Sequence, residues 1–216
     1  METSVVDKPE SASRIDELLD AASEGQRQAM DKAIYRAQLL SESDSRDWYF
    51  GRIIRVLVQT AELDKAIELM ELIHHPLEKK DALLQVANAL ITMGQIEQSE
   101  QKLEEVEKIL PTIAGEAYSM WQRAEALDQI ALLRLRVGQR DRALVLWQQA
   151  IGAAQAGQRN DSTPQEIWDS AGVLAEIACH LAAAGQVVLA RTVASEIRIE
   201  NKRQSAIETI TRIERD

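Results

Sequence analysis

The amino-acid sequence predicts an all-α fold, in which pairs of helices repeat along the chain and are joined by short breaks. Three observations predict this fold. Apolar residues make up 45% of the 216 residues, which is enough to bury a core. Good helix formers are abundant, whereas the chain has only 9 Gly, 4 Pro and 4% aromatic residues. Several stretches of the chain also align with one another, which indicates internal repeats.

Each aligned stretch contains an apolar helix, a short break and a second helix. The breaks fall at Ala61, Gly94, Gly138 and Gly185. Gly suits such a break because it adopts the left-handed conformation that ends a helix without a steric cost. The aligned stretches are GRIIRVLVQTAELDKAIELM, LLQVANALITMGQIEQSEQKL, LDQIALLRLRVGQRDRALVLW and LAEIACHLAAAGQVVLARTVA.

The spacing of apolar and small residues around the breaks also repeats. Small residues at facing positions let two helices cross closely, and larger apolar residues fill the space beside them. Four positions carry the pattern, at 11 and 7 residues before each break and at 5 and 12 residues after it. They hold Phe50, Leu83, Leu127 and Leu174; then Ile54, Ala87, Ala131 and Ala178; then Ala66, Ser99, Ala143 and Ala190; and finally Ile73, Val106, Ala150 and Ile197.

The pattern resembles the tetratricopeptide (TPR) repeat, a helix–turn–helix unit of about 34 residues with small residues at the close contact. The resemblance covers roughly residues 46 to 200 and is carried in one unit by Ala87, Gly94, Ser99 and Pro111, and in the next by Ala131, Gly138, Ala143 and Trp147. It implies a right-handed α-solenoid of about 10 to 11 helices.

The order of elements along the chain follows from these breaks. Residues 1–11 combine charge, Ser and Pro without periodicity and are expected to be a disordered tail. Residues 12–216 are expected to form a single domain, with units at about 12–44, 46–76, 77–111, 115–160 and 163–200 and a capping helix at 201–215.

Local signals mark the helix ends. A break near Gly25 joins the two helices of the first unit, and the SESDSRD turn offers N-caps for a helix that begins near Asp47. The Thr163–Glu166 segment is a capping box with Pro at the first helical position, which predicts a helix start. The last helix has Ile207, Ile210 and Ile213 on one face and charged residues on the other, which is typical of a cap that keeps a solenoid soluble.

Charge and composition argue against two classes of partner and against export. The net charge of −10 and the pI of about 4.9 disfavour nucleic acid, since phosphate binding needs a basic face, and they disfavour anionic membranes for the same reason. The N-terminus lacks a signal peptide, no apolar run could span a bilayer, and Cys179 is the only cysteine. We therefore expect a cytoplasmic protein.

No motif for catalysis, cofactor or metal binding stands out, so we expect no cofactor, no metal site and no enzymatic activity. The adjacent His74 and His75 precede Pro76 and are interpreted as a helix end, where a cation favours the C-terminal dipole. Cys179 and His180 are neighbours on one helix, so their side chains do not face each other as a catalytic pair would; a packed thiol beside a surface or satisfied imidazole is expected.

The TPR resemblance implies that the first helices of successive units line a concave face that binds a partner protein or peptide. Trp147 is expected in the core, whereas Trp48 belongs either to the core or to this binding face, where Trp is enriched. From their positions in the aligned units, the residues implied to lie on this face are Trp48, Arg55, Gln59, Asp81, Leu84, Asn88, Ile91, Glu125, Asp128, Leu132 and Arg136.

In the last unit the same positions are the small residues Gly172, Ala175, Cys179, Ala182 and Ala183. Either the chain's own last helix or a helix of a partner could cover this strip. The function predicted first is a protein–protein interaction module or adaptor. The alternatives are a small acidic chaperone for a secreted or assembling subunit and, third, a helical enzyme with scattered site residues.

Overall fold

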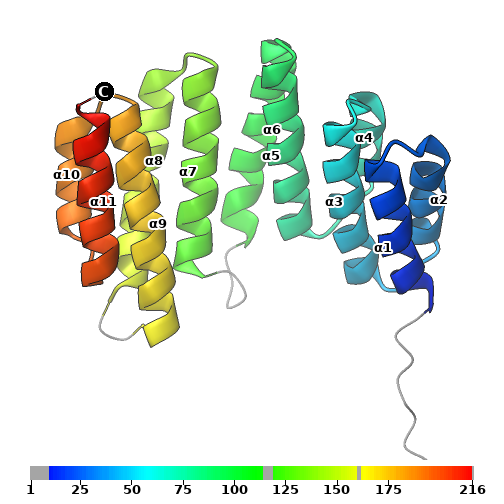
Figure 1. Cartoon of the computed structure of the whole chain (residues 1–216), viewed down its shortest axis with the longest axis horizontal. Coiled ribbons are helices and arrows are strands. Elements are labelled where there is room, and N and C mark those ends of the chain that lie inside the picture. The colour runs from blue at the N-terminus through cyan, green and yellow to red at the C-terminus, as the bar shows by residue number, and fades with distance from the viewer. Residues whose placement is uncertain (1–9, 114–118, 160–161, 216) are drawn as a thin grey trace, which may run out of the picture. The chain divides into compact units, whose positions relative to one another are not determined.

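The computed structural model describes residues 10–113, 119–159 and 162–215, and these residues form eleven α-helices and one 3-10 helix (Figure 1). No strand occurs within these ranges. The predicted all-α fold is therefore confirmed. The chain divides into two compact units, Met1–Thr112 and Ile113–Asp216. The expectation of a single domain over residues 12–216 stays a prediction.

The N-terminal unit contains three helix pairs. They are α1 (Glu10–Ser23) with α2 (Arg27–Gln38), α3 (Ser43–Gln59) with α4 (Leu63–Met70), and α5 (Pro76–Thr92) with α6 (Ile96–Ile109); the 3-10 helix Leu110–Ile113 follows. The C-terminal unit contains α7 (Met120–Arg136) with α8 (Arg140–Gly157), α9 (Pro164–Ala183) with α10 (Val187–Ser195), and α11 (Glu200–Ile213).

The same packing order holds inside each unit. The first helix of a pair packs against its own second helix and against the first helix of the next pair, as α3 does with α4 and α5, and α9 with α10 and α11. The second helix also contacts the next first helix, as α2 contacts α3 and α8 contacts α9. Each pair therefore buries its apolar faces both within itself and against its neighbour.

A left-handed residue ends the first helix of every pair. Gly94, Gly138 and Gly185 have φ values of 76°, 82° and 77°, and Gly25 has 93°. Ala61 adopts the same conformation with φ 61°, although it carries a side chain. All four predicted breaks are thus left-handed turns, and Ala61 holds the conformation at the steric cost of its Cβ atom.

The hydrogen bonds at these breaks are those of the Schellman motif. After α7, the N–H of Gly138 donates to the carbonyl of Leu135 at 3.0 Å, and the N–H of Gln139 donates to the carbonyl of Arg134 at 2.9 Å. The same two bonds recur at the other four breaks. The motif satisfies carbonyls that the end of a helix leaves without partners, and it reverses the chain within a few residues.

The positions that repeat around the breaks are all buried. The residues at 11 and 7 before each break, and at 5 and 12 after it, are at most 5% exposed in all four pairs. Trp147, on α8, is fully buried, as expected. The predicted core positions therefore agree with the structure.

Some predicted element ends differ from the structure. The helix expected near Asp47 begins at Ser43, because the Ser and Asp residues read as a turn form its first turn. Helix α1 begins at Glu10, inside the expected tail; residues 1–9 of that tail, and 115–118 of the third unit, lie outside the described residues. The capping box is confirmed: the Thr163 side chain accepts from the Glu166 N–H, and Pro164 is the first helical residue.

Replacing Gly138 by Ala tests the left-handed turns. No atom lies within 4 Å of the position that a Cβ would take, so the cost comes from the backbone conformation alone. We expect Gly138→Ala to lower the free energy of unfolding by about 1 kcal/mol, measured by urea denaturation. The control is Gly152→Ala, inside α8 and equally open, which should raise stability by about 0.5–1 kcal/mol. If Gly138→Ala and Gly152→Ala changed the free energy of unfolding equally, the left-handed conformation of the turn would not be the cause of the loss.

Candidate functional site

The three predicted binding residues of α3, Trp48, Arg55 and Gln59, lie on one face of the helix together with the half-buried Arg52, which the sequence did not single out. Trp48, Arg52, Arg55 and Gln59, here called the α3 stripe, follow one another at spacings of three and four residues and therefore share a face. Trp48 is 46% exposed, so the structure places it at the surface rather than in the core. Arg55 and Gln59 are exposed as well.

A cation lies over the exposed tryptophan of the α3 stripe. The guanidinium carbon of Arg52 is 4.9 Å from the centre of the Trp48 ring, and the same guanidinium pairs with Asp16 on α1. Tyr49 packs edge-on against Trp48 at 4.8 Å between ring centroids, and burial raises the pKa of its phenol. These contacts hold the indole ring in one orientation while leaving nearly half of it open to a partner.

The predicted residues of α5 lie partly on the surface and partly in the core. Asp81 and Asn88 are exposed and Ile91 is half-buried, whereas Leu84 is only 7% exposed. The expectation that Leu84 faces a partner therefore needs correction, because its side chain is buried, although Asn88, four residues later on nearly the same side of α5, is exposed. Asp81 pairs with Lys80 at 2.7 Å between nitrogen and oxygen.

A buried carboxylate fixes α3 against the start of α5. Asp47 is 1% exposed, and its Oδ2 atom accepts the backbone N–H groups of His74 at 2.8 Å and His75 at 2.7 Å. His75 is the N-cap residue of α5, and His74 precedes it. The two histidines thus lie at the beginning of a helix, not at the C-terminal end expected from the sequence; the loop after α4 places them there.

Helices α3 and α5 also approach each other closely beside this carboxylate. A Cβ atom at Gly51 would lie 3.0 Å from a carboxylate oxygen of Glu78. Burial raises the pKa of Glu78, and the nearby Asp81 raises it further. The exposed side chains of α3 and α5 are therefore carried by two helices whose spacing is set by tight contacts beneath them.

In the C-terminal unit, the predicted Asp128 lies in the interior instead of on a binding face. It is 3% exposed, and its Oδ1 atom accepts the indole N–H of Trp147 at 2.8 Å. Its Oδ2 atom lies 2.9 Å from Nδ1 of His180. The carboxylate therefore joins α7, α8 and α9. Removing either of its two partners would leave a buried charge without full compensation, which destabilises the fold. Of the other predicted residues on α7, Glu125 and Leu132 are half-buried and Arg136 is exposed.

His180 is part of this buried network, which the sequence did not reveal. Its hydrogen bond with Asp128 raises the pKa of the imidazole, burial opposes the rise, and the charges of Asp128 and Glu176 add to it. The expected satisfied imidazole is therefore present, but its partner comes from a helix 52 residues earlier in the chain.

The strip of small residues on α9 is partly covered by the chain's own last helix, which packs against α9. Burial raises the pKa of the Cys179 thiol, while the side chain of Thr209 on α11 lowers it. The position that a Cβ would take at Gly172 lies 3.8 Å from Nζ of Lys202, also on α11. The sequence left open whether the chain's own last helix or a helix of a partner covers this strip, and the structure favours the chain's own helix. Within the strip, Ala182 is buried, Ala175 is half-buried and Ala183 is exposed.

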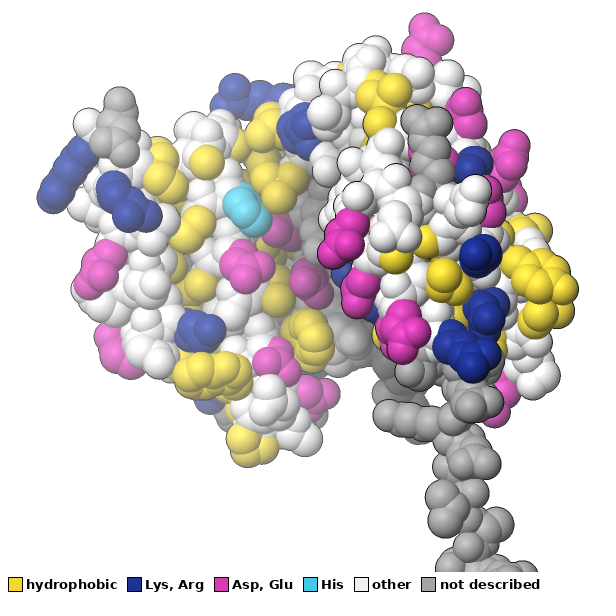
Figure 2. Space-filling model, turned by 45° about the vertical axis from the view of Figure 1, so that its right-hand side comes forward, with side chains coloured by type: hydrophobic (Ala, Val, Ile, Leu, Met, Phe, Trp, Pro, Cys, Tyr) yellow, Lys and Arg dark blue, Asp and Glu magenta, His cyan; other side chains and the backbone are white. Residues whose placement is uncertain are grey.

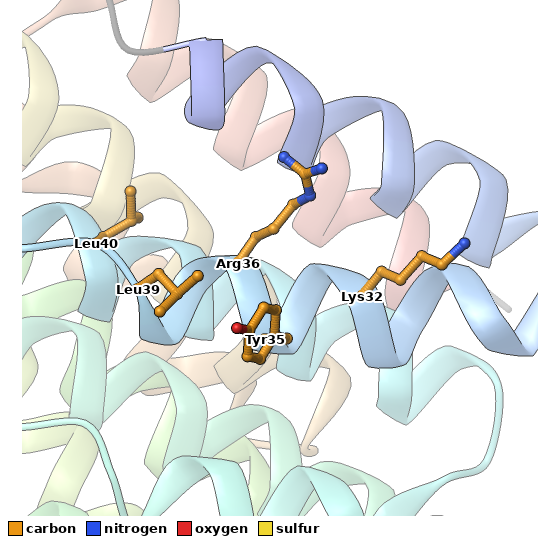
Figure 3. A pocket seen from close by; sticks show the side chains of 5 residues that line it. All are labelled: Lys32, Tyr35, Arg36, Leu39 and Leu40. Carbon is orange, nitrogen blue, oxygen red and sulfur yellow. The ribbon is translucent and has the colours of Figure 1, made fainter.

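An exposed surface on α2 was missed from the sequence. Lys32, Tyr35, Arg36, Leu39 and Leu40, here called the α2 patch, line a hollow of about 470 Å³ (Figure 3). The spacing of Tyr35 and Leu39, four residues apart on a helix, was the available signal.

The described residues offer neither a metal site nor a membrane-spanning helix. Among the side chains that are described, no group of three His, Cys, Asp or Glu residues is placed to hold a metal ion. Within the described helices, none combines the length and hydropathy that crossing a bilayer requires.

Comparisons with known proteins bear on the fold alone. No protein-family model and no curated protein sequence matches the chain. Among solved structures, the crystal structure of Ton1535 from Thermococcus onnurineus NA1 is similar, with a TM-score of 0.59 and 13% sequence identity. The match covers 92% of this chain and 57% of that one, so this chain spans little more than half the length of Ton1535.

The Asp128–His180 pair predicts how stability depends on pH. Because folding raises the pKa of His180, the pair stabilises the fold fully below the ordinary histidine pKa, and this contribution is lost as the pH rises through the raised value. We expect the free energy of unfolding to fall between pH 6 and pH 9. About a third of the imidazole is exposed, so the loss should be about 1 kcal/mol or less.

Urea denaturation of the parent and of His180→Gln at both pH values measures this contribution. The decrease should be smaller in His180→Gln than in the parent. His74→Gln, which removes an exposed histidine elsewhere, is the control. A decrease of the same size in His180→Gln and in the parent would contradict the assignment.

Proposed function

We propose that this chain is a protein-binding module built from TPR-like helix pairs, and that a partner segment binds across the first helices of the N-terminal unit. The repeat assignment is supported by left-handed breaks of one kind and by buried residues at constant distances from them. It is also supported by first helices that pack against the next first helix within each unit. Such stacks present their first helices as a continuous surface.

The α3 stripe is the observation that carries the proposal. It combines a large, half-exposed aromatic ring with Arg52 and Arg55, and Trp and Arg are the residues that contribute most to binding energy at protein interfaces. The ring is already fixed by Arg52 and Tyr49, so a partner loses little side-chain entropy by packing against it.

Polar groups beside the ring suit an extended or helical segment of a partner. Arg55 and Gln59 continue the stripe along α3, while Asp81 and Asn88 are exposed on the adjacent helix α5. These side chains can pair with acidic groups, basic groups and the backbone of a bound segment. Contacts of this kind give a groove between helices its specificity. The surface is therefore adapted to a polypeptide with an apolar anchor for Trp48.

Site-specific photo-crosslinking tests this proposal. A photoreactive phenylalanine analogue at Gln59, on the first helix α3, should give a covalent adduct with one partner in the cells from which the sequence comes. The same analogue at Gln101, an equally exposed glutamine on the second helix α6, should not. Adding Trp48→Ala should reduce the Gln59 adduct about tenfold or more, since a central tryptophan contributes about 2 kcal/mol or more.

The matched control for this tryptophan is Trp168→Ala. Trp168, on α9, is 43% exposed and also has a cation over its ring, Lys202 Nζ at 5.0 Å. Its replacement should leave the adduct unchanged. Equal crosslinking from Gln59 and Gln101, or an adduct that survives Trp48→Ala, would refute binding at the α3 stripe.

A further inference from the structure

The α2 patch is a second exposed surface, on a different helix from the α3 stripe. Tyr35 is 63% exposed and Leu39 is 65% exposed, and both are among the largest apolar groups left open by the fold. Figure 3 shows the side chains of the patch standing along one side of α2, with Arg36 extending toward α1 and Lys32 one turn away from it. Two large apolar side chains this exposed, side by side over a hollow, indicate a surface that another molecule covers.

The charge of the α2 patch is opposite to that of the chain. The whole protein has 35 acidic and 25 basic residues, yet the patch contains Lys32 and Arg36 and no acidic residue. Within the described part of the chain, neither cation forms an ion pair. On the face of the N-terminal unit shown in Figure 2, basic and hydrophobic side chains gather next to one another, and acidic side chains occupy the neighbouring surface.

The other end of the chain lacks such a surface. Helix α11 buries Ala206 and Ile210 and exposes polar residues, among them Asn201, Gln204 and Glu208. A polar outer face of this kind needs no partner. Helix α2 differs, because its inner side contributes Ala33 and Ala37 to the core, while its outer side carries the exposed Tyr35 and is followed by Leu39 and Leu40 at the end of the helix.

From this arrangement we propose that the α2 patch binds an acidic amphipathic helix of a partner protein. Tyr35 and Leu39 accept the apolar side chains of that helix, and its carboxylates pair with Lys32 and Arg36. The patch follows the last two turns of α2 from Lys32 and continues into Leu39 and Leu40, which follow the end of the helix at Gln38, and this length matches anchors spaced over two turns of a bound helix. The site is separate from the α3 stripe and does not rest on it.

Charge complementarity favours an acidic polypeptide over a lipid surface. A membrane-surface helix requires an excess of cations to approach anionic lipids, whereas this chain has a net charge of −10. A partner helix needs to meet only the local patch, where the two cations flank the apolar side chains. Pairing at such a rim sets specificity, and the tyrosine and leucine contacts supply affinity.

Fluorescence anisotropy with designed peptides tests the proposal on the full chain. One labelled peptide carries Glu on one face and Leu at positions i, i+3, i+4 and i+7; a second has Lys for each Glu, and a third has Gln for each Leu. We expect the first peptide to bind about tenfold or more tightly than either of the others. Both Arg36→Glu and Leu39→Gln should weaken its binding about tenfold, because each removes one half of the recognition.

Lys108→Glu is the matched control for Arg36→Glu. Both residues are cations in the last turn of a helix of the N-terminal unit, so the two variants change the net charge and the helix-end electrostatics equally. Lys108→Glu should change the affinity less than twofold. Circular dichroism of each variant establishes that helicity is retained, as expected for substitutions on the surface.

Four results would overturn the proposal. Equal weakening by Lys108→Glu would mean that the peptide senses only the overall field of the protein. Equal binding of the peptide with Gln in place of Leu would remove the apolar half of the recognition. Arg36-dependent binding to vesicles containing phosphatidylserine, without binding of the acidic peptide, would assign the patch to a membrane. A dimer seen by sedimentation, and lost in Leu39→Gln, would assign it to a second copy of this chain.

Discussion

The whole arrangement depends on one backbone constraint, the left-handed residue that closes each first helix. A single position with positive φ lets the N–H groups of the turn reach back to the carbonyls of the preceding helix, so the second helix starts at a fixed angle and distance. Because every pair uses the same turn, the facing positions on both helices keep the same register. Small residues such as Ala87 and Ser99 can then be placed where the helices cross.

Ala61 shows how strong that constraint is. The turn between α3 and α4 keeps its left-handed conformation and its two hydrogen bonds although the residue is not glycine. Contacts elsewhere in the pair therefore outweigh the local steric cost of the Cβ atom. The apolar register of the sequence nevertheless predicted a break at Ala61, where composition alone did not.

The sequence predicted the helix pairs and the buried positions because these depend on local spacing. It predicted the surface less well, since exposure depends on which helix covers which. Asp128 and His180 are far apart in the chain, and nothing near Asp128 indicates that Trp147 and His180 would enclose it. Leu84 and the exposed Asn88 are four residues apart on nearly the same side of α5, so helical spacing alone does not distinguish the buried residue from the exposed one. On α3, Arg55 and Gln59 are exposed as expected, whereas the sequence left Trp48 open between core and surface and did not single out Arg52.

Two buried carboxylates have comparable roles in the two units. Asp47 binds the backbone that leads into α5, and Asp128 binds side chains of α8 and α9. Both lie on a first helix and both join it to a later pair. Each unit therefore combines apolar packing with a buried carboxylate, and removal of a partner of that carboxylate leaves a buried group without compensation.

The cover that α11 places over α9 gives the protein a built-in reporter. Cys179 is the only cysteine in the chain, and it lies half-buried on the side of α9 that faces Thr209 of α11. Because α11 shields part of this thiol, a thiol reagent should modify it faster when the C-terminal helix lifts away from its neighbour. The protein can be followed in this way without any label being added, and fraying at its end can be distinguished from unfolding of the whole chain.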